Sequence, residues 1–355
     1  MLALQSSGVA LVAGLVAVAA TYFVMILARV FGFMDAPAEA RKIHNKPVPL
    51  LGGVALFVAL GAATVFAYSQ GYITDTRVSP RLIVALFGAG AVLNIVGALD
   101  DRFRLRWWQQ AIGPLAAVGI MLAAGLDIPF VSNPFGSGTL NLQTASILGS
   151  IVPVGKILVL VWLVGMMYTT KLLDGIDGLA TSVSGVAALV LFMVSLTWDR
   201  SGSVTSFLSA GLAGAAAGFL VWNFFPAKIF LGEGGSTFLG LLLAVLAILS
   251  GGKIATALLI MGVPILDVVW LIVRRLIAGQ HVFTGDNRHL HFRLLRAGLS
   301  QRQVVLLLSG LSLLFGSVSF FYTTRVKIIA LAVLVAFVLI LEALLTSRYE
   351  NSPHR

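Results

Sequence analysis

The sequence predicts an all-α, polytopic membrane protein that forms a single domain over residues 1–355. Hydrophobic residues make up 59% of the chain and charged residues only 11%, a balance that a soluble domain of this length does not show. Apolar segments of about 20 residues, the length that a helix needs to cross a bilayer, recur along the chain. The chain has no cysteine, which excludes disulfides, a thiolate nucleophile and cysteine-ligated metals.

Eleven apolar segments are long enough to be predicted as membrane-spanning helices. They cover residues 8–31, 50–68, 81–99, 108–126, 153–171, 178–198, 205–223, 229–250, 254–273, 303–322 and 327–347. An odd number of spans puts the two termini on opposite sides of the membrane. Between the fourth and fifth segments, residues 128–131 and 139–142 flank an Asn-Pro-Phe-Gly-Ser-Gly turn, which predicts a short hairpin.

The distribution of Lys and Arg predicts the orientation of the chain. With the N-terminus outside and the C-terminus in the cytoplasm, 17 of the 24 Lys and Arg residues fall on the cytoplasmic side, as the positive-inside rule requires. Most acidic residues and all five histidines fall on that side too, which predicts one active site at the cytoplasmic face. The net charge of +10 fits cytoplasmic loops and anionic lipid or phosphate ligands, and we expect no nucleic-acid partner.

The segment Lys171-Leu-Leu-Asp-Gly-Ile-Asp-Gly-Leu179 places two carboxylates directly after a strongly apolar run. Charged groups at that depth are costly unless they face a cavity, a metal or a partner. Asp174 and Asp177 are three residues apart, so on a helical turn they would share one face and could bind one divalent cation. The alternative is a solvated loop just past a membrane helix.

Asp100 and Asp101 close the third apolar segment, and three arginines follow within five residues. Adjacent carboxylates repel each other unless a cation lies beside them. The pair therefore indicates metal or phosphate handling, with one carboxylate acting as a base. The alternative is a helix end of mixed charge at the membrane interface.

Three further motifs carry polar side chains on the predicted cytoplasmic side. A glycine-rich turn around Glu233 offers backbone N–H groups to a phosphate while its carboxylate holds a cation. The loop through His289 and His291 suits anion binding or proton transfer better than zinc, which would need a third ligand, or else it is a basic loop against lipid headgroups. The basic segment that contains Lys42 and His44 could hold a pyrophosphate or simply follow the positive-inside rule.

Taken in order from Asp35 to Arg293, these motifs resemble the polyprenyl-phosphate N-acetylhexosamine-1-phosphate transferase family (glycosyltransferase family 4, undecaprenyl-phosphate GlcNAc-1-phosphate transferase-like). The resemblance implies transfer of a sugar 1-phosphate, GlcNAc-1-phosphate in the first place, from a UDP-sugar to a polyprenyl phosphate. UMP would be released, and the product would start a cell-envelope glycan. It also implies a multi-pass protein of the cell membrane, eleven helices, and Mg²⁺, or Mn²⁺, as the cofactor.

The resemblance implies a role for each residue that matches a family motif. The catalytic residues would be Asp100, Asp101, Asp174 and Asp177, with the division of roles among them left open. The metal would be held by Glu233, Asp100 and Asp174. The substrates would be bound by Lys171, Asn223, Arg288, His289, His291, Arg293, Lys42 and His44.

Four positions depart from the family's pattern. Lys171 stands where the family has Asn, Glu233 where it has Asp, Gln110 where it has a basic residue, and Phe292 where it has a last His. We therefore expect an active subfamily with an altered site, and a catalytically inactive relative stays open. So does a phospho-N-acetylmuramoyl-pentapeptide transferase, although that branch is expected to have ten helices and a longer histidine motif. A transporter is disfavoured because the charges gather at one interface. The sequence identifies neither the UDP-sugar nor the oligomeric state, for which a homodimer is one option.

Overall fold

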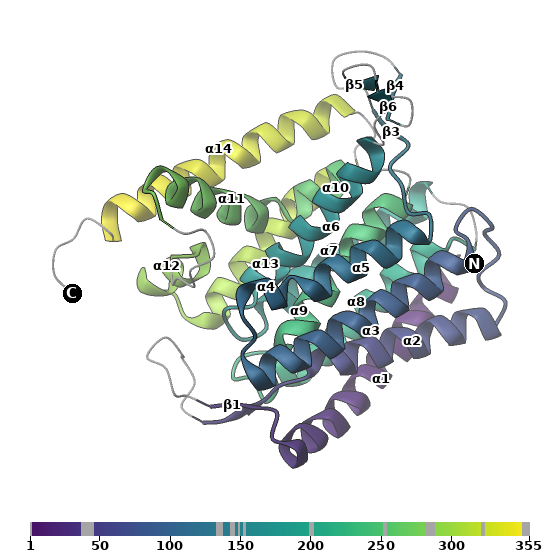
Figure 1. Ribbon diagram of the computed structural model, residues 1–355, viewed down its shortest axis with the longest axis horizontal. Helices are drawn as coiled ribbons and strands as arrows, with labels where there is room; N and C mark the ends of the chain where they lie inside the picture. Colours follow the sequence, from purple (N-terminus) through teal and green to yellow (C-terminus); the bar gives the residue numbers. More distant parts are fainter. Residues whose placement is uncertain are drawn as a thin grey trace.

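The computed structural model describes residues 2–36, 46–132, 138–142, 146–147, 150–151, 154–198, 202–250, 254–280, 288–320 and 324–349. The described chain is a bundle of helices with three small antiparallel strand pairs, which confirms the predicted all-α membrane fold (Figure 1). The predicted positions Lys42 and His44 lie outside the described residues. Helix α1 begins at one end of the bundle and α14 ends at the opposite end (Figure 1). Which end faces the cytoplasm stays a prediction.

The helices follow the predicted apolar segments closely. They are α1 (Leu2–Phe31), α2 (Gly52–Ser69), α3 (Pro80–Phe103), α4 (Trp107–Gln110), α5 (Ile112–Ala123), α6 (Val154–Leu173), α7 (Leu179–Trp198), α8 (Val204–Asn223), α9 (Gly232–Leu249), α10 (Ile254–Ile260), α11 (Gly262–Ile277), α12 (Leu290–Arg296), α13 (Gln301–Ser317), the 3₁₀ turn η1 (Val318–Phe320) and α14 (Thr324–Tyr349). The strand pairs are β1 (Met34–Asp35) with β2 (Val48–Pro49), β3 (Phe130–Ser132) with β4 (Thr139–Asn141), and β5 (Ser146–Ile147) with β6 (Ser150–Ile151). The β3–β4 pair is the hairpin predicted between the fourth and fifth segments.

Two of the eleven predicted spans differ from straight membrane helices. In the described part of the chain, nine helices are long and apolar enough to cross a membrane, and α10 with α11 makes ten if this pair, bent by 78°, is one span. Pro264 lies in the first turn of α11, which is a position where a helix tolerates proline, because the missing N–H there removes no helical hydrogen bond. The predicted span 108–126 is α4 followed by α5, and the 12 residues of α5 cover only about 18 Å.

Helix α9 is the centre of the bundle. It packs against α2, α3, α6, α7, α8 and α10, and nearly all of its residues are buried. A helix that is apolar all round belongs in such a position. By contrast, α1 and α14 turn large apolar side chains such as Leu15 and Ile340 outward, as expected for helices that face lipid.

Glycines let α2 and α3 approach the first turn of α9. A Cβ atom placed on Gly97 of α3 would lie 2.1 Å from the backbone nitrogen of Gly234, and one placed on Gly53 of α2 would lie 2.3 Å from the Cα atom of Gly235. Small residues allow helix backbones in membranes to come this close. The contact brings the acidic end of α3 next to Glu233 and so positions the candidate site.

We predict that Gly97→Ala lowers the free energy of unfolding by about 1–3 kcal/mol, because the new methyl group collides with rigid backbone. Gly88→Ala on the same helix is the matched control, since a Cβ there meets nothing within 4 Å. Thermal unfolding of both variants in detergent measures the difference. Equal stability of the two variants would contradict the close contact between α3 and α9.

Candidate active site

Asp100 and Asp101, which are adjacent at the end of α3, accept hydrogen bonds from different parts of the chain. Asp100 is buried, and its Oδ1 accepts hydrogen bonds from the backbone N–H of Leu105 (2.8 Å) and from Gln110 Nε2 (3.2 Å). Asp101 accepts from the backbone N–H of Glu233, which lies 3.3 Å from each of its oxygens. Asp100 therefore holds the chain where it turns into α4, and Asp101 caps the N-terminus of α9.

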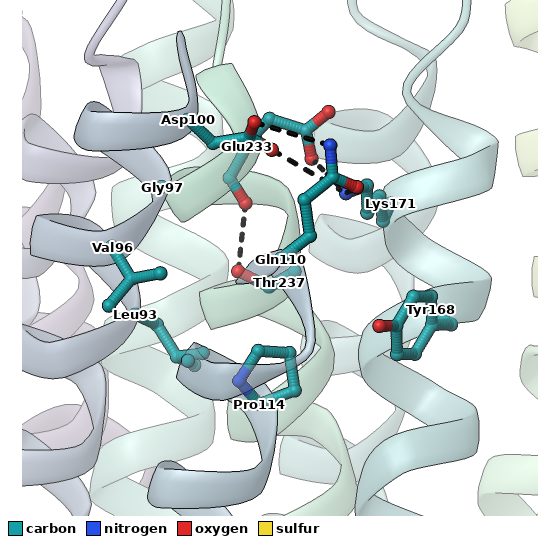
Figure 2. A pocket seen from close by; sticks show the side chains of 11 residues that line it. Leu93, Val96, Gly97, Asp100, Gln110, Pro114, Tyr168, Lys171, Glu233 and Thr237 are labelled. Atoms are coloured by element: carbon teal, nitrogen blue, oxygen red, sulfur yellow. Dashed lines mark hydrogen bonds and ion pairs between the residues drawn. The ribbon is translucent and has the colours of Figure 1, made fainter. Parts of the chain in front are cut away.

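Lys171 is the cation at the centre of this cluster. Its Nζ atom lies 2.8 Å from Glu233 Oε2 and 3.9 Å from Asp100 Oδ2, and it donates a 3.0 Å hydrogen bond to Gln110 Oε1. Figure 2 shows these side chains converging from α3, α4, α6 and α9. The ammonium group thus lies next to both carboxylates and offsets part of their mutual repulsion.

A cleft begins at this polar cluster and continues into the bundle (Figure 2). Its polar end is formed by Asp100, Gln110, Lys171 and Glu233. The rest is lined by residues of α3, α5, α6 and α9, namely Leu93, Val96, Gly97, Gly113, Pro114, Tyr168 and Thr237. Since Leu93 and Val96 precede Asp100 along α3, the apolar part of the cleft lies on the membrane side of the charges.

Asp174 and Asp177 lie in the turn between α6 and α7, not on a continuous helical face. Asp177 Oδ2 accepts a hydrogen bond from the backbone N–H of Ala227 (2.9 Å), which ties this turn to the segment after α8. Within the described part of the chain, the carboxylate of Asp174 makes no hydrogen bond or ion pair. Burial raises the pKa of Asp174 well above its usual value, and the nearby charges of Glu233, Asp101 and Asp177 raise it further.

The histidine loop meets the aspartate turn at Gly175. His289 Nδ1 lies 2.9 Å from Asp267 Oδ2, and His291 stacks parallel to His289 with ring centroids 5.7 Å apart. The Nε2 atom of buried His291 would lie 2.2 Å from a Cβ on Gly175, so the ring lies directly against the turn. Burial lowers the pKa of His291 to about 4; neighbouring His289 also lowers it, while the charge of Asp267 opposes the shift. His291 is therefore neutral near pH 7.

Two residues predicted to bind substrate are instead buried supports. The side chain of Asn223 accepts from Thr181 Oγ1 (2.8 Å) and donates to the carbonyl oxygen of Ile229 (3.0 Å), so both of its ends are used inside the protein. Arg293 is 2% exposed and ion-paired with Glu342. In both cases the partner, Thr181 or Glu342, is far away in the sequence, so only the fold shows that the side chain is used inside the protein. Arg288 is exposed at the start of the described loop, as a ligand-binding residue requires.

The sequence predicts that the glycine-rich turn offers free N–H groups to a phosphate, but in the structure these groups face other parts of the protein. The N–H of Glu233 is bound by Asp101, and Gly234 and Gly235 are pressed against α3 and α2. The glycines therefore serve close helix packing.

Asp267 and Glu342 are buried acids that the motifs in the sequence do not single out. Asp267 lies inside α11 beside His289, and Glu342 lies inside α14 and is ion-paired with Arg293. The available signal was an acidic residue within an apolar span, which at membrane depth implies a buried partner.

The predicted metal set of Asp100, Asp174 and Glu233 is not assembled as three ligands around one point. Among the residues that the structure describes, no group of three or more His, Asp or Glu side chains is arranged to hold a metal ion. Lys171 pairs with both Asp100 and Glu233. The donor chemistry still fits Mg²⁺, because that ion commonly takes only one or two carboxylates and completes its shell with substrate phosphate and water oxygens.

Comparison with known proteins identifies the class of protein to which this fold and cleft belong. Residues 83–251, which include α3, α6 and α9, match the family model described as glycosyl transferase family 4. The chain is 35% identical over 323 residues to decaprenyl-phosphate N-acetylglucosaminephosphotransferase of Mycobacterium tuberculosis, covering 83% of this chain and 78% of the relative. The chain is thus a membrane-embedded glycosyl transferase of family 4.

Two further relatives define the branch more closely. The chain is 32% identical over 292 residues to a probable undecaprenyl-phosphate N-acetylglucosaminyl 1-phosphate transferase of Bacillus subtilis, covering 80% of this chain and 75% of the relative. It is 30% identical over 309 residues to undecaprenyl-phosphate alpha-N-acetylglucosaminyl 1-phosphate transferase of Escherichia coli, covering 84% and 78%. The chain therefore belongs to the polyprenyl-phosphate N-acetylglucosamine-phosphate transferases, which confirms the resemblance drawn from its motifs.

We predict that Lys171→Met lowers the free energy of unfolding by about 1–3 kcal/mol, because it leaves Asp100 and Glu233 facing each other without a cation. The effect is smaller than for a fully buried pair, since the Glu233 side chain is 35% exposed. Adding Glu233→Gln to Lys171→Met removes one of the two carboxylates, so at least half of the lost stability returns. Thermal unfolding in detergent of the wild type, the two single variants and the double variant completes a double-mutant cycle. Strictly additive losses of stability would show that Lys171 and Glu233 do not interact.

We predict that burial of neutral His291 makes the protein less stable in acid. Its pKa is lowered from 6.5 to about 4 in the folded state, so the unfolded chain binds the proton first. Above pH 6.5 this ring is neutral in both states and does not lower the stability. As the pH falls from 6.5 to 4, the free energy of unfolding falls by about 3 kcal/mol. His291→Gln cannot bind this proton, so its stability declines less over the same range. Unfolding measured from pH 4 to 7 tests this, and parallel curves for the two proteins would refute it.

Proposed function

We propose that this protein transfers GlcNAc-1-phosphate from UDP-GlcNAc to a polyprenyl phosphate, and that the reaction takes place at the cytoplasmic face of the cell membrane. The observation that carries the proposal is the convergence of Asp100, Lys171 and Glu233 at the polar end of a cleft whose other end is apolar. Asp101 binds the N–H of Glu233, and Asp174 is near enough for the charge of Glu233 to raise its pKa. The printed names of the relatives supply the sugar and the lipid acceptor. The arginines that follow α3 support the cytoplasmic placement through the positive-inside rule.

The cleft suits an acceptor that is half lipid and half phosphate. Leu93, Val96 and Pro114 form an apolar wall on its membrane side, next to which a prenyl chain can lie. Lys171 at the polar end can receive the phosphate, because its ammonium group is only partly buried. This arrangement would place the lipid phosphate beside the acidic turn after α6.

The reaction that follows needs no covalent bond to the protein. An oxygen of the lipid phosphate attacks the phosphorus that carries the sugar, a new P–O bond forms, the P–O bond to UMP breaks, and UMP leaves. Asp174 has oxygens available to take a proton from the lipid phosphate or to share a cation with Glu233. When bound, Mg²⁺ would neutralise charge on the diphosphate and on the departing UMP. His289, His291 and Arg288 lie on the side of the turn from which the nucleotide sugar would be held.

We predict that Asp174→Asn, Glu233→Ala and Asp100→Asn each lower UMP release by about 100-fold or more, because each removes a carboxyl group that can exchange a proton or bind a cation at the reacting groups. Asp75→Asn is the control: this acid pairs with Arg77 ahead of α3, outside the cleft. The assay uses purified protein in detergent with Mg²⁺, undecaprenyl phosphate and UDP-GlcNAc. Near-wild-type turnover in all three variants would defeat the assignment.

The same assay separates the remaining alternatives. A panel of UDP-sugars that includes UDP-N-acetylmuramoyl-pentapeptide identifies the donor, and turnover of that compound alone would favour the pentapeptide transferase. Removal of divalent ions with EDTA should abolish UMP release, and Mg²⁺ or Mn²⁺ should restore it. An absence of turnover with every donor would indicate an inactive relative.

A further inference from the structure

Glu342 is a fully buried acid in a helix that otherwise faces lipid. Most of the apolar window of α14 is exposed at the surface of the bundle, yet Glu342 is 0% exposed. A carboxylate at this depth is costly unless a partner compensates it. Glu342 must therefore be understood through the residues that it contacts.

The partners of Glu342 lead to the histidine loop. Glu342 Oε2 is ion-paired with Arg293 Nη1 of α12, and the next helix that reaches this loop, α11, contributes the buried Asp267. Asp267 in turn lies 2.9 Å from His289 Nδ1 through one oxygen and accepts the backbone N–H of Leu290 at 2.9 Å through the other. Two buried acids from two helices thus hold both ends of the first turn of α12.

The short helix α12 depends on such anchors. It has seven residues, too few to be stable by itself in water, and it packs against α13 and α14 (Figure 1). Its His291 ring reaches Gly175, between the two acids of the turn after α6. A displacement of α12 by about 1 Å would move His289 and His291 away from that turn, and errors of this size can cost about 100-fold in rate.

We infer that Glu342 and Asp267 are positioning residues: α14 and α11 hold the His289–His291 loop against the Asp174–Asp177 turn of the active site. The inference rests on the proposed function, since it assigns the loop to that site. Neither acid lines the cleft, so they act through the residues that they hold. The alternative is that the buried pair only attaches α14 to the bundle.

The double variant Arg293→Met/Glu342→Met separates the two roles. Replacing a buried ion pair by apolar side chains of similar volume is often neutral or stabilising, so the helix can stay attached. Positioning would still be lost, because a methionine pair does not fix the orientation of α12 as the ion pair does. We expect the unfolding temperature to stay near the wild-type value while kcat falls at least 10-fold and KM for the UDP-sugar changes less than 3-fold. Wild-type kcat at wild-type stability would overturn the inference.

Glu342→Gln and Asp267→Asn keep the shape of each side chain and serve if the double variant does not fold. Each should lower kcat per folded molecule, whereas Arg293→Lys, which keeps the charge, should retain more activity than Arg293→Met. Ser312→Ala is the matched control, because Ser312 is a buried polar residue of α13 whose hydroxyl makes no hydrogen bond to these residues. An unchanged kcat per folded molecule in both acid variants would overturn the inference.

A distance measurement tests the same point without activity. The chain has no cysteine, so spin labels can be attached to cysteines introduced at exposed Leu172 and Arg296 only. We expect one narrow distance distribution in the wild-type background and a broader or shifted one with Glu342→Gln. Identical distributions would overturn positioning. Because this readout needs no substrate, a failure of the proposed function in the UMP assay remains distinguishable from a failure of this inference.

Discussion

The ammonium group of Lys171 is the interaction on which the arrangement of the site depends. It lies between the carboxylates of Asp100 and Glu233, which come from α3 and α9, and it also donates to Gln110 of α4. Close to a membrane, carboxylates without a cation would repel one another and draw in water or protons. The lysine allows the ends of four helices to meet with their charges intact, ready for an anionic substrate.

Close backbone packing makes that meeting possible. The glycines of the turn around Glu233 could have formed a phosphate-binding loop, but Gly97 of α3 and Gly53 of α2 pack directly against them. The position of Glu233 is therefore set by helix contacts deep in the bundle, and Asp101 fixes it further by accepting its N–H. Asp101 and Glu233 are 132 residues apart in the chain, and close backbone packing, which is more rigid than side-chain contacts, holds them together.

Much of this could be predicted from the sequence, because the relevant signals are local or depend only on counting. Apolar length predicted most of the helices, and the order of the predicted spans placed Asp100, Asp174 and Glu233 at span ends on one side. In the structure, Lys171 joins Asp100 to Glu233, and the charge of Glu233 affects Asp174. The bend before α11 and the short α5 were not predicted, since a proline in a helix-starting position does not interrupt apolar length. The roles of Asn223 and Arg293 were also missed, because Thr181 and Glu342 lie 42 and 49 residues away, and only the fold pairs them.

Two of the four departures from the family's pattern, at Gln110 and Lys171, involve side chains that contact each other. The resemblance expects a basic residue where Gln110 stands and an amide where Lys171 stands, and in this chain these two side chains touch at 3.0 Å. In this chain the cation lies on α6 and the amide on α4, the reverse of what the resemblance expects. The longer Glu233 then reaches this cation at 2.8 Å. A site that had lost its function would have no reason to preserve the charge of its cleft in this way, so the three substitutions together favour an active subfamily over an inactive relative.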